Sequence, residues 1–165
     1  MNPLPDAVVL VLAEARRYLQ VREQPRDSNR SIEIDYWLHE VGVPLALPWC
    51  AAFVWNMGRQ ALGTHAWPVP RTASCQALHD WAESKGILKL SPEPGDLFLL
   101  WESTLTPQRF GHTGLVTDVA TPGRYASIEG NTNPGGSRDG YGVFARSRPI
   151  DETTRYVRWA QLAAA

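Results

Sequence analysis

Cysteine is scarce in this chain, which has two cysteines in 165 residues. Two cysteines cannot build the disulfide framework of a small secreted scaffold, and Cys50 and Cys75 lie outside any C-x-x-C pattern. The four histidines are scattered, so the paired ligand spacing of a structural zinc site is absent from the sequence. A single disulfide between Cys50 and Cys75 stays open, although their different sequence contexts argue against it.

An excess of charge of either sign is also lacking. Sixteen Lys and Arg residues stand against seventeen Asp and Glu residues, which gives a formal net charge of −1. No block of like charge is longer than a pair. Binding to a nucleic-acid backbone needs a concentrated basic face, so we expect no nucleic-acid partner.

A long uninterrupted apolar run is missing as well. The longest uncharged segment, 41–58, approaches the length of a membrane span. Gly42, Pro44 and Pro48 interrupt it, and a proline inside a helix costs about 3 kcal/mol. We expect a core segment there and no insertion into a membrane. The first six residues show neither a basic region nor a small-residue cleavage site, so no Sec-type signal is readable and synthesis in the cytoplasm is expected.

The overall amino-acid composition is that of a folded globular protein. Hydrophobic residues make up 44% of the chain and charged residues 20%. Seven tryptophans argue against a disordered chain, since such chains are poor in aromatic residues. The length corresponds to about one domain, and neither an internal repeat nor a linker is visible. We expect one domain over residues 1–165 and a monomer.

The hydrophobic period changes halfway along the chain. The first half shows helical spacing, as at Val8, Leu12, Ala15 and Leu19. The second half consists of short strand-like segments separated by Gly, Pro, Asn and Asp. The predicted helices are 7–19, 34–41, 48–62 and 74–84, and the predicted strands are 97–101, 113–119, 125–128, 143–148 and 155–159. Helices followed by strands predict an α+β fold with an antiparallel sheet.

One cysteine and one histidine stand in positions that favour nucleophilic catalysis. Cys50 falls at the start of a helix predicted to be buried, where unpaired N–H groups and the positive dipole end lower the pKa of a thiol. His112 stands between Gly111 and Gly114 at the predicted start of a strand. An imidazole at that point can reach the tip of the helix and act as the base that a cysteine nucleophile needs.

A catalytic base also needs an acceptor that orients it. Glu129 and Asn131 are two residues apart, so in an extended chain their side chains point to the same face. Either can hydrogen-bond His112, and a carboxylate is the stronger partner. Taken singly, each residue also fits a structural role: Cys50 as a small buried hydrophobe, His112 as a turn residue and Glu129 as a solvated strand end.

The remaining candidates for chemistry have plainer contexts. Cys75 shares one helical stripe with Leu78 and Trp81, which favours a structural role. His39, His65 and His79 are expected to be surface or partly buried side chains.

Four motifs occur in order along the chain: PWCAAFV at 48–54, PGDL at 94–97, GHTGLV at 111–116 and IEGN at 128–131. Sixty-two residues separate Cys50 from His112, and a further seventeen separate His112 from Glu129. This arrangement closely resembles the CHAP family of cysteine- and histidine-dependent amidohydrolases and peptidases, relatives of the NlpC/P60 and papain-like enzymes. The resemblance covers about residues 7–150.

The resemblance implies a papain-like, NlpC/P60-like α+β fold with N-terminal helices packed on a small antiparallel sheet. It also implies hydrolysis of amide bonds, usually in bacterial peptidoglycan. Carried over to this chain, Cys50 is the nucleophile, His112 the base, Glu129 its orienter and Asn131 a supporting polar group. Some members bind calcium through acidic residues just before the cysteine. The stretch 43–47 has no carboxylate, so we expect no metal and no other cofactor.

Aromatic residues and one glycine-rich loop are candidates for binding the substrate. Trp49, Trp101 and Tyr141 are expected to line the groove, because aromatic faces suit sugars and peptide stems. Core packing fits Trp49 and Trp101 equally well. The loop 131–142 either flexes over the site or forms a long hairpin connection.

The sequence leaves the substrate bond and the biological setting open. The muramoyl–L-alanine amide and bonds within the stem peptide are both compatible with it. A phage lysin released by a holin and an antibacterial effector with a secretion apparatus and an immunity partner both fit a catalytic domain without a wall-binding module. Two further hypotheses are an amidohydrolase acting on a non-wall amide, such as a glutathionyl-polyamine or an isopeptide, and an inactive CHAP-like binding domain.

Overall fold

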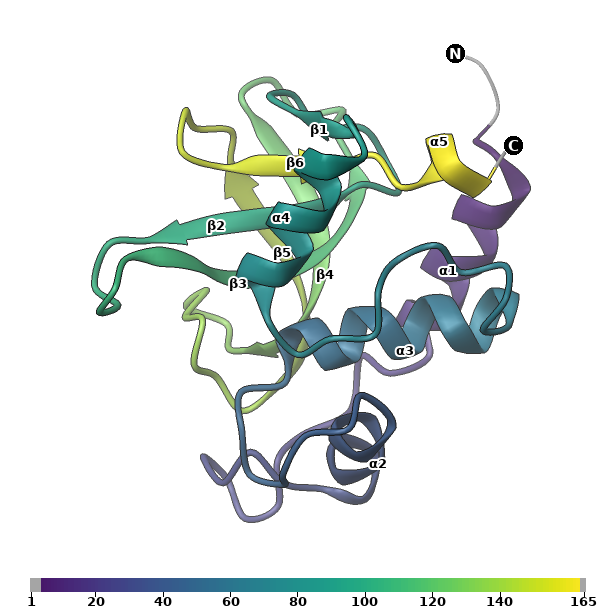
Figure 1. Ribbon diagram of the computed structural model, residues 1–165. Helices are drawn as coiled ribbons and strands as arrows, with labels where there is room; N and C mark the ends of the chain where they lie inside the picture. The colour runs from purple at the N-terminus through teal and green to yellow at the C-terminus, as the bar shows by residue number, and fades with distance from the viewer. Residues whose placement is uncertain (1–3, 164–165) are drawn as a thin grey trace.

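The computed structural model describes residues 4–163, which form five helices and one six-stranded sheet (Figure 1). The helices are α1 (Asp6–Arg16), α2 (Ile32–Glu40), α3 (Cys50–Leu62), α4 (Cys75–Ser84) and α5 (Ala160–Ala163). The strands are β1 (Leu88–Lys89), β2 (Leu97–Glu102), β3 (Arg109–Asp118), β4 (Arg124–Thr132), β5 (Gly142–Pro149) and β6 (Arg155–Val157). Their order is β1-β6-β2-β3-β4-β5, and all neighbouring strands are antiparallel. The predicted α+β class is confirmed, with the helices packed on a small antiparallel sheet.

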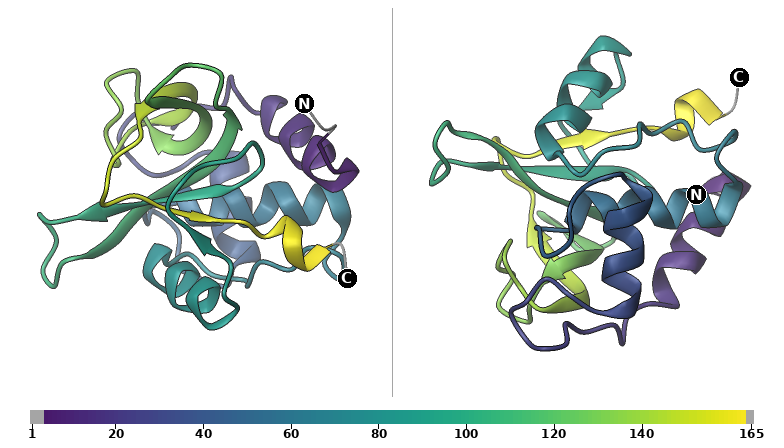
Figure 2. Two further views of the ribbon diagram at one scale, coloured as in Figure 1. Left: turned by 90° about the horizontal axis from the view of Figure 1, so that it is seen from above. Right: turned by 60° about the horizontal axis from the view of Figure 1, so that its bottom comes forward.

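Helix α3 lies at the centre of the molecule. Every residue from Cys50 to Gly58 is buried, as a helix that is apolar nearly all round requires. Helices α1 and α2 pack against α3, and α3 in turn packs against β3 and β4. Figures 1 and 2 show α3 running beneath the sheet, with α2 on its other side and α4 over a different part of the sheet. The start of α3 is thereby held against the strands that carry His112 and Glu129.

Side-chain caps begin two of the helices but not α3. The hydroxyl of Ser31 accepts a hydrogen bond from the backbone N–H of Ile34, and that of Ser74 accepts one from Ala77. Such caps contribute about 1 kcal/mol each. The residue before α3 is Trp49, whose side chain makes no cap. The first N–H groups of α3 therefore lack a side-chain cap.

Several helix bounds differ from the predicted ones. Helix α1 ends at Arg16 instead of residue 19, and α2 begins at Ile32 instead of residue 34, because Ser31 caps it there. Helix α3 begins at Cys50 instead of residue 48, because Trp49 has a non-helical backbone with φ −122° and ψ 12°. Cys50 is thus the first residue of its helix.

Strand β3 is longer than predicted and carries His112 as its fourth residue instead of near its start. The pairing of β2 with β3 shifts register between Leu100 and Trp101 and then continues to Glu102 opposite Arg109. A bulge of this kind re-aims neighbouring side chains and breaks the simple alternation that sequence patterns rely on.

The two faces of the sheet bury different sets of side chains. The face toward the helices belongs to the main core, where Trp37 lies 5.6 Å from Trp49 and 5.3 Å from Phe53 between ring centroids. On the strands, the side chains that alternate with those of the core face form a smaller cluster on the opposite face of the sheet. Its buried members are Phe98, Val116, Tyr125 and Tyr156. Burial of each large apolar side chain contributes about 1.5–3 kcal/mol.

A glycine allows β4 to approach the start of α3. A Cβ atom added at Gly130 would lie 2.6 Å from the ring of Trp49 and 2.8 Å from Phe53. Real Cβ atoms do not come so close to other atoms, so a larger residue at this position would push β4 away from α3. The close contact brings Glu129, the preceding residue, toward the helix that carries Cys50.

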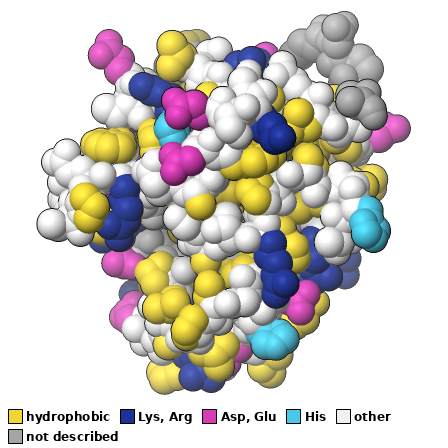
Figure 3. Space-filling view, in the orientation of Figure 1, with side chains coloured by type: hydrophobic (Ala, Val, Ile, Leu, Met, Phe, Trp, Pro, Cys, Tyr) yellow, Lys and Arg dark blue, Asp and Glu magenta, His cyan; other side chains and the backbone are white. Residues whose placement is uncertain are grey.

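Charges of both signs are interspersed on the surface seen in Figure 3, and apolar side chains are scattered among them. Within residues 4–163, none of the helices has the length and apolar character needed to cross a membrane.

Candidate active site

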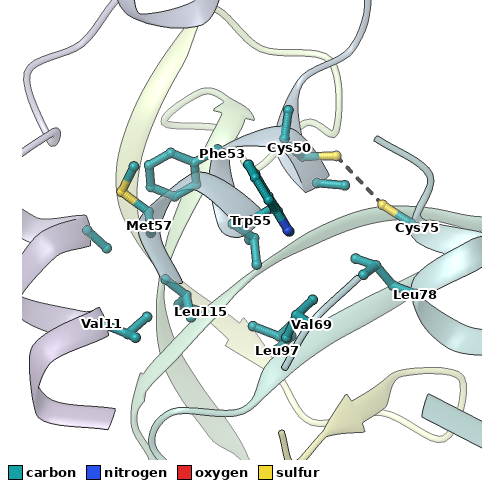
Figure 4. Packing of buried hydrophobic residues seen from close by; sticks show 14 of the residues in the cluster. Val11, Cys50, Phe53, Trp55, Met57, Val69, Cys75, Leu78, Leu97 and Leu115 are labelled. Carbon is teal, nitrogen blue, oxygen red and sulfur yellow. Dashed lines mark hydrogen bonds between the residues drawn. The ribbon is translucent and has the colours of Figure 1, made fainter. Parts of the chain in front are cut away.

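Cys50 is placed by the N-terminus of α3. Its side chain is buried, with 3% of the residue exposed, and it lies where the helix dipole is positive. Figure 4 shows its sulfur pointing toward that of Cys75, at the start of α4. A helix start favours the thiolate over the thiol, which is the reactive form of cysteine.

His112 reaches the same point from β3. The residue is fully buried, and its Nε2 lies 2.9 Å from Oε2 of Glu129. The other ring nitrogen, Nδ1, has no hydrogen-bond partner among the described residues. It is therefore the nitrogen left for the sulfur of Cys50, with which the imidazole interacts electrostatically.

Glu129 is held by three side chains. Besides its contact with His112, its carboxylate accepts hydrogen bonds from the Ser127 hydroxyl at 2.6 Å and from Arg148 at 2.7 and 2.6 Å. Glu129 is fully buried. A buried charge is tolerated only when it is paired and hydrogen-bonded, and this carboxylate meets both conditions.

The pKa values of the three residues shift in the directions that nucleophilic catalysis needs. A hydrogen bond from Cys75 is the largest influence that lowers the pKa of Cys50, and His112 lowers it further against the opposing effect of burial. Burial alone would lower the pKa of His112, but the Cys50 and Glu129 side chains outweigh it and raise that pKa to about 9. Burial would raise the pKa of Glu129, yet His112 and Arg148 bring it down to about 2. The favoured state is a thiolate beside an imidazolium.

A groove of about 270 Å³ opens at the sulfur of Cys50. Its walls combine apolar residues with two arginines, Arg109 and Arg138. The full set of lining residues is Leu47, Pro48, Cys50, Ala73, Ser74, Cys75, Leu105, Arg109, Phe110, Gly111 and Arg138. Cys50 is thus buried on one side and open to a ligand on the other.

Asn131 does not join the contact between His112 and Glu129. The pairing of β4 with β5 shifts register between Glu129 and Thr132, and Asn131 has a positive φ of 57°. This irregularity ends the extended backbone that would have put Asn131 on the face of Glu129. Its side-chain amide instead donates to the backbone oxygen of Arg138. Asn131 therefore supports the loop that brings Arg138 to the groove.

None of the three aromatic residues expected in the groove is placed there. Trp49 is fully buried, and its indole N–H donates to Glu23 at 3.0 Å, so the ring belongs to the core. Trp101 is 40% exposed, but it packs edge-on against Phe110, which is the aromatic residue that lines the groove. Tyr141 packs beneath the guanidinium of Arg26.

The glycine-rich loop is a hairpin connection between β4 and β5. Its backbone is tied down by Thr132, whose hydroxyl donates to the oxygen of Ser137, and by Arg148, which donates to the oxygen of Gly136. Of the two alternatives for 131–142, the structure shows the long hairpin.

Three functional features escape sequence reasoning. Arg148 and Ser127 bind Glu129 through a sheet register that no local pattern reveals. Cys75 was expected to be structural, but its sulfur lies 3.7 Å from that of Cys50 and both cysteines are free (Figure 4). The helical stripe that Cys75 shares with Leu78 and Trp81 correctly predicted that Cys75 is buried. It did not predict that the thiol of Cys75 lies next to that of Cys50.

Among residues 4–163, no group of three or more His, Cys, Asp or Glu side chains is arranged to hold a metal ion.

Comparisons with known proteins identify the family of the chain. No curated protein matches the chain. Among solved structures, the crystal structure of Ly7917 is similar to 91% of this chain at 18% sequence identity, with a TM-score of 0.48, and the match spans 61% of Ly7917. The family model of the CHAP domain matches residues 42–131, a stretch that includes Cys50, His112 and Glu129. Members of this family are typically amidases and peptidases, and the chain described here belongs to the CHAP domain family.

Proposed function

We propose that this protein is a cysteine hydrolase that cleaves an amide bond in the stem peptides of bacterial peptidoglycan. The observation that carries the proposal is that Cys50 lines a groove while His112 and Glu129, in contact with each other, are buried behind it. Cys50 comes from α3, His112 from β3 and Glu129 from β4. In the proposed reaction they serve as the nucleophile, the base and the carboxylate that orients the base.

The reaction follows from the protonation states. The thiolate of Cys50 attacks the amide carbonyl, and the imidazolium of His112 gives its proton to the leaving amine. Water then hydrolyses the thioester, with the neutral imidazole acting as the base. Helix α3 has no side-chain cap, and the backbone N–H of Cys50 would hold the developing oxyanion. One such donor is typically worth about 2.7–4 kcal/mol of barrier.

The charge of the groove supports a substrate that carries carboxylates. Arg138 is already paired with Glu102 at 3.6 Å, whereas Arg109 has no ion pair among the described residues. Stem peptides carry free carboxylates, and a guanidinium binds a carboxylate through two parallel hydrogen bonds. We assign Arg109 to such a carboxylate of the substrate.

Digestion of purified peptidoglycan tests the proposal. Wild-type protein is expected to release soluble fragments, and mass spectrometry of the new ends identifies the muramoyl–L-alanine amide or a bond within the stem. Cys50→Ser should lower the rate by ~10³-fold or more while leaving the fold intact. Its thermal unfolding, followed by circular dichroism, is the control for folding.

Two results would contradict the proposal in different ways. Intact peptidoglycan together with cleavage of a glutathionyl-polyamine or an isopeptide would assign the site to a non-wall amide. Release of fragments by the folded Cys50→Ser variant would show that Cys50 is not the nucleophile.

A further inference from the structure

The two cysteines of the chain face each other across the groove. Their sulfur atoms are 3.7 Å apart although 25 positions separate them in the sequence, and both thiols are free (Figure 4). Both residues line the groove. In hydrolysis as described above, Cys75 does not react and only donates the hydrogen bond that lowers the pKa of Cys50. Two free sulfur atoms in contact can also react with each other when an oxidant is present.

Two helices direct their N-termini at this pair. Cys50 is the first residue of α3, and Cys75 is the first residue of α4. A helix start favours the thiolate, which is the form of cysteine that is oxidised. Cys50, whose pKa is lowered, is therefore the member of the pair that reacts first with an oxidant.

We propose that Cys50 and Cys75 are a peroxide-sensitive pair that forms a reversible intramolecular disulfide. The bond would occupy the sulfur of Cys50 and switch off hydrolysis. That loss of activity rests on the proposed function, whereas formation of the bond does not.

The chemistry balances with hydrogen peroxide as the oxidant. The Cys50 thiolate attacks one peroxide oxygen, the O–O bond breaks, and Cys50 sulfenic acid and hydroxide are formed. The sulfur of Cys75 then attacks the sulfenic sulfur, the S–O bond breaks, and the departing hydroxide takes the proton of Cys75 as water. The two sulfurs together lose two electrons, and the peroxide is reduced to hydroxide and water.

The surroundings of Cys75 suit this second step. While Cys50 is ionised, its hydrogen bond to Cys75, burial and the thiolate charge raise the pKa of Cys75 and keep that residue protonated. Conversion of Cys50 to the neutral sulfenic acid removes the thiolate charge, so Cys75 can give up its proton at the step in which its sulfur attacks. A disulfide has an S–S length of about 2.05 Å, so the sulfurs must approach by ~1.7 Å. The chain has no other cysteine to compete for the sulfenic acid.

Peptide mapping after oxidation tests the proposal. Purified wild-type protein is treated with a small molar excess of hydrogen peroxide, alkylated and digested with trypsin. We expect the intact protein to lose the mass of two hydrogens and peptides 31–59 and 72–85 to become linked. Dithiothreitol should restore both free thiols. If a cleavable substrate is available, it should also restore the rate at which the protein hydrolyses that substrate.

Two matched variants separate the roles of the sulfurs. Cys75→Ser should form no linked peptides, and Cys50 should instead gain one oxygen, trapped by dimedone, and then two oxygens that dithiothreitol does not remove. In Cys50→Ser, the thiol of Cys75 should resist the same dose of peroxide.

The test measures peptide masses, so its outcome does not depend on whether the protein is a hydrolase. Wild-type protein that gains oxygen at Cys50 while Cys75 stays free would overturn the proposal, as would disulfides between two copies of the chain. A linked peptide in a protein that cleaves no peptidoglycan would support the pair and contradict only the proposed function.

Discussion

Arg148 donates hydrogen bonds to both carboxylate oxygens of Glu129, at 2.7 and 2.6 Å, and so ties β5 to the candidate active site. The fork of a guanidinium matches a carboxylate in this geometry. Glu129 in turn contacts His112. The orientation of His112 therefore depends on an arginine that lies outside the stretch matched by the family model.

Replacement of Arg148 by Met is expected to destabilise the fold. The variant leaves the buried carboxylate of Glu129 without its cationic partner, and breaking a buried pair in this way typically costs about 3–5 kcal/mol. Arg124→Met is the matched control, because Arg124 is an exposed arginine on the neighbouring strand. Its cost should stay within about 0.5 kcal/mol. Urea unfolding at neutral pH measures both values, and equal losses would contradict the role of Arg148.

The pH dependence of hydrolysis should follow the ion pair of Cys50 and His112. The pKa of Cys50 is lowered, so the thiolate persists well below the usual pH of thiol ionisation. The pKa of His112 is raised to about 9, so the proton donor is lost as the pH rises through about 9. The rate should show a plateau across neutral pH and an alkaline fall near pH 9. A rate that is still rising at pH 9 would show that the pair is not formed.

The two shifts together predict how stability varies with pH. The raised pKa of His112 makes a contribution to stability that is complete below pH 6.5 and is lost between pH 6.5 and about 9. The lowered pKa of Cys50 makes the opposite contribution, because the folded protein has already released a proton that the unfolded thiol still holds. The two contributions offset each other, so thermal unfolding at a series of pH values should show a nearly constant stability of the pair over this interval. A steep fall in stability between pH 6.5 and about 9 would contradict the ion pair.

Arg109→Gln should weaken substrate binding more than turnover. A hydrogen bond to a charged group is worth about 1.5–3 kcal/mol, so KM for a stem peptide should rise by about tenfold or more while kcat changes little. A substrate with the carboxylate converted to an amide should bind wild type and variant equally. Arg124→Gln serves as the control, and an unchanged KM in Arg109→Gln would remove this residue from the substrate site.

Gly95→Ala should lower stability without affecting the site. Gly95 has a φ of 98°, and an added Cβ would lie 2.5 Å from the side chain of Val8 in α1. Strain and overpacking together should cost about 2–4 kcal/mol. Gly123→Ala separates the two effects, because Gly123 also has a positive φ of 70° but has no atom within 4 Å of its added Cβ. Similar melting temperatures for the two variants would show that contact with Val8 is unimportant.

Much of the site could be predicted because its local determinants are short. Glycines flank His112, a proline and a tryptophan precede Cys50, and a carboxylate stands in a strand-like segment. The α+β class followed from the change of hydrophobic period between the two halves. These features depend on neighbours along the chain, and they can therefore be read from one sequence.

The sequence by itself determined which residues can act as nucleophile, base and orienter, and it determined the class of fold. Only the tertiary structure decided that Arg148 and Ser127 bind Glu129, that Trp49 turns into the core and that Cys75 faces Cys50. These contacts depend on strand register, on bulges in β3 and β4 and on the packing of α4 against β3. Register and packing are set by the sum of many interactions between distant segments, and no local pattern contains that sum.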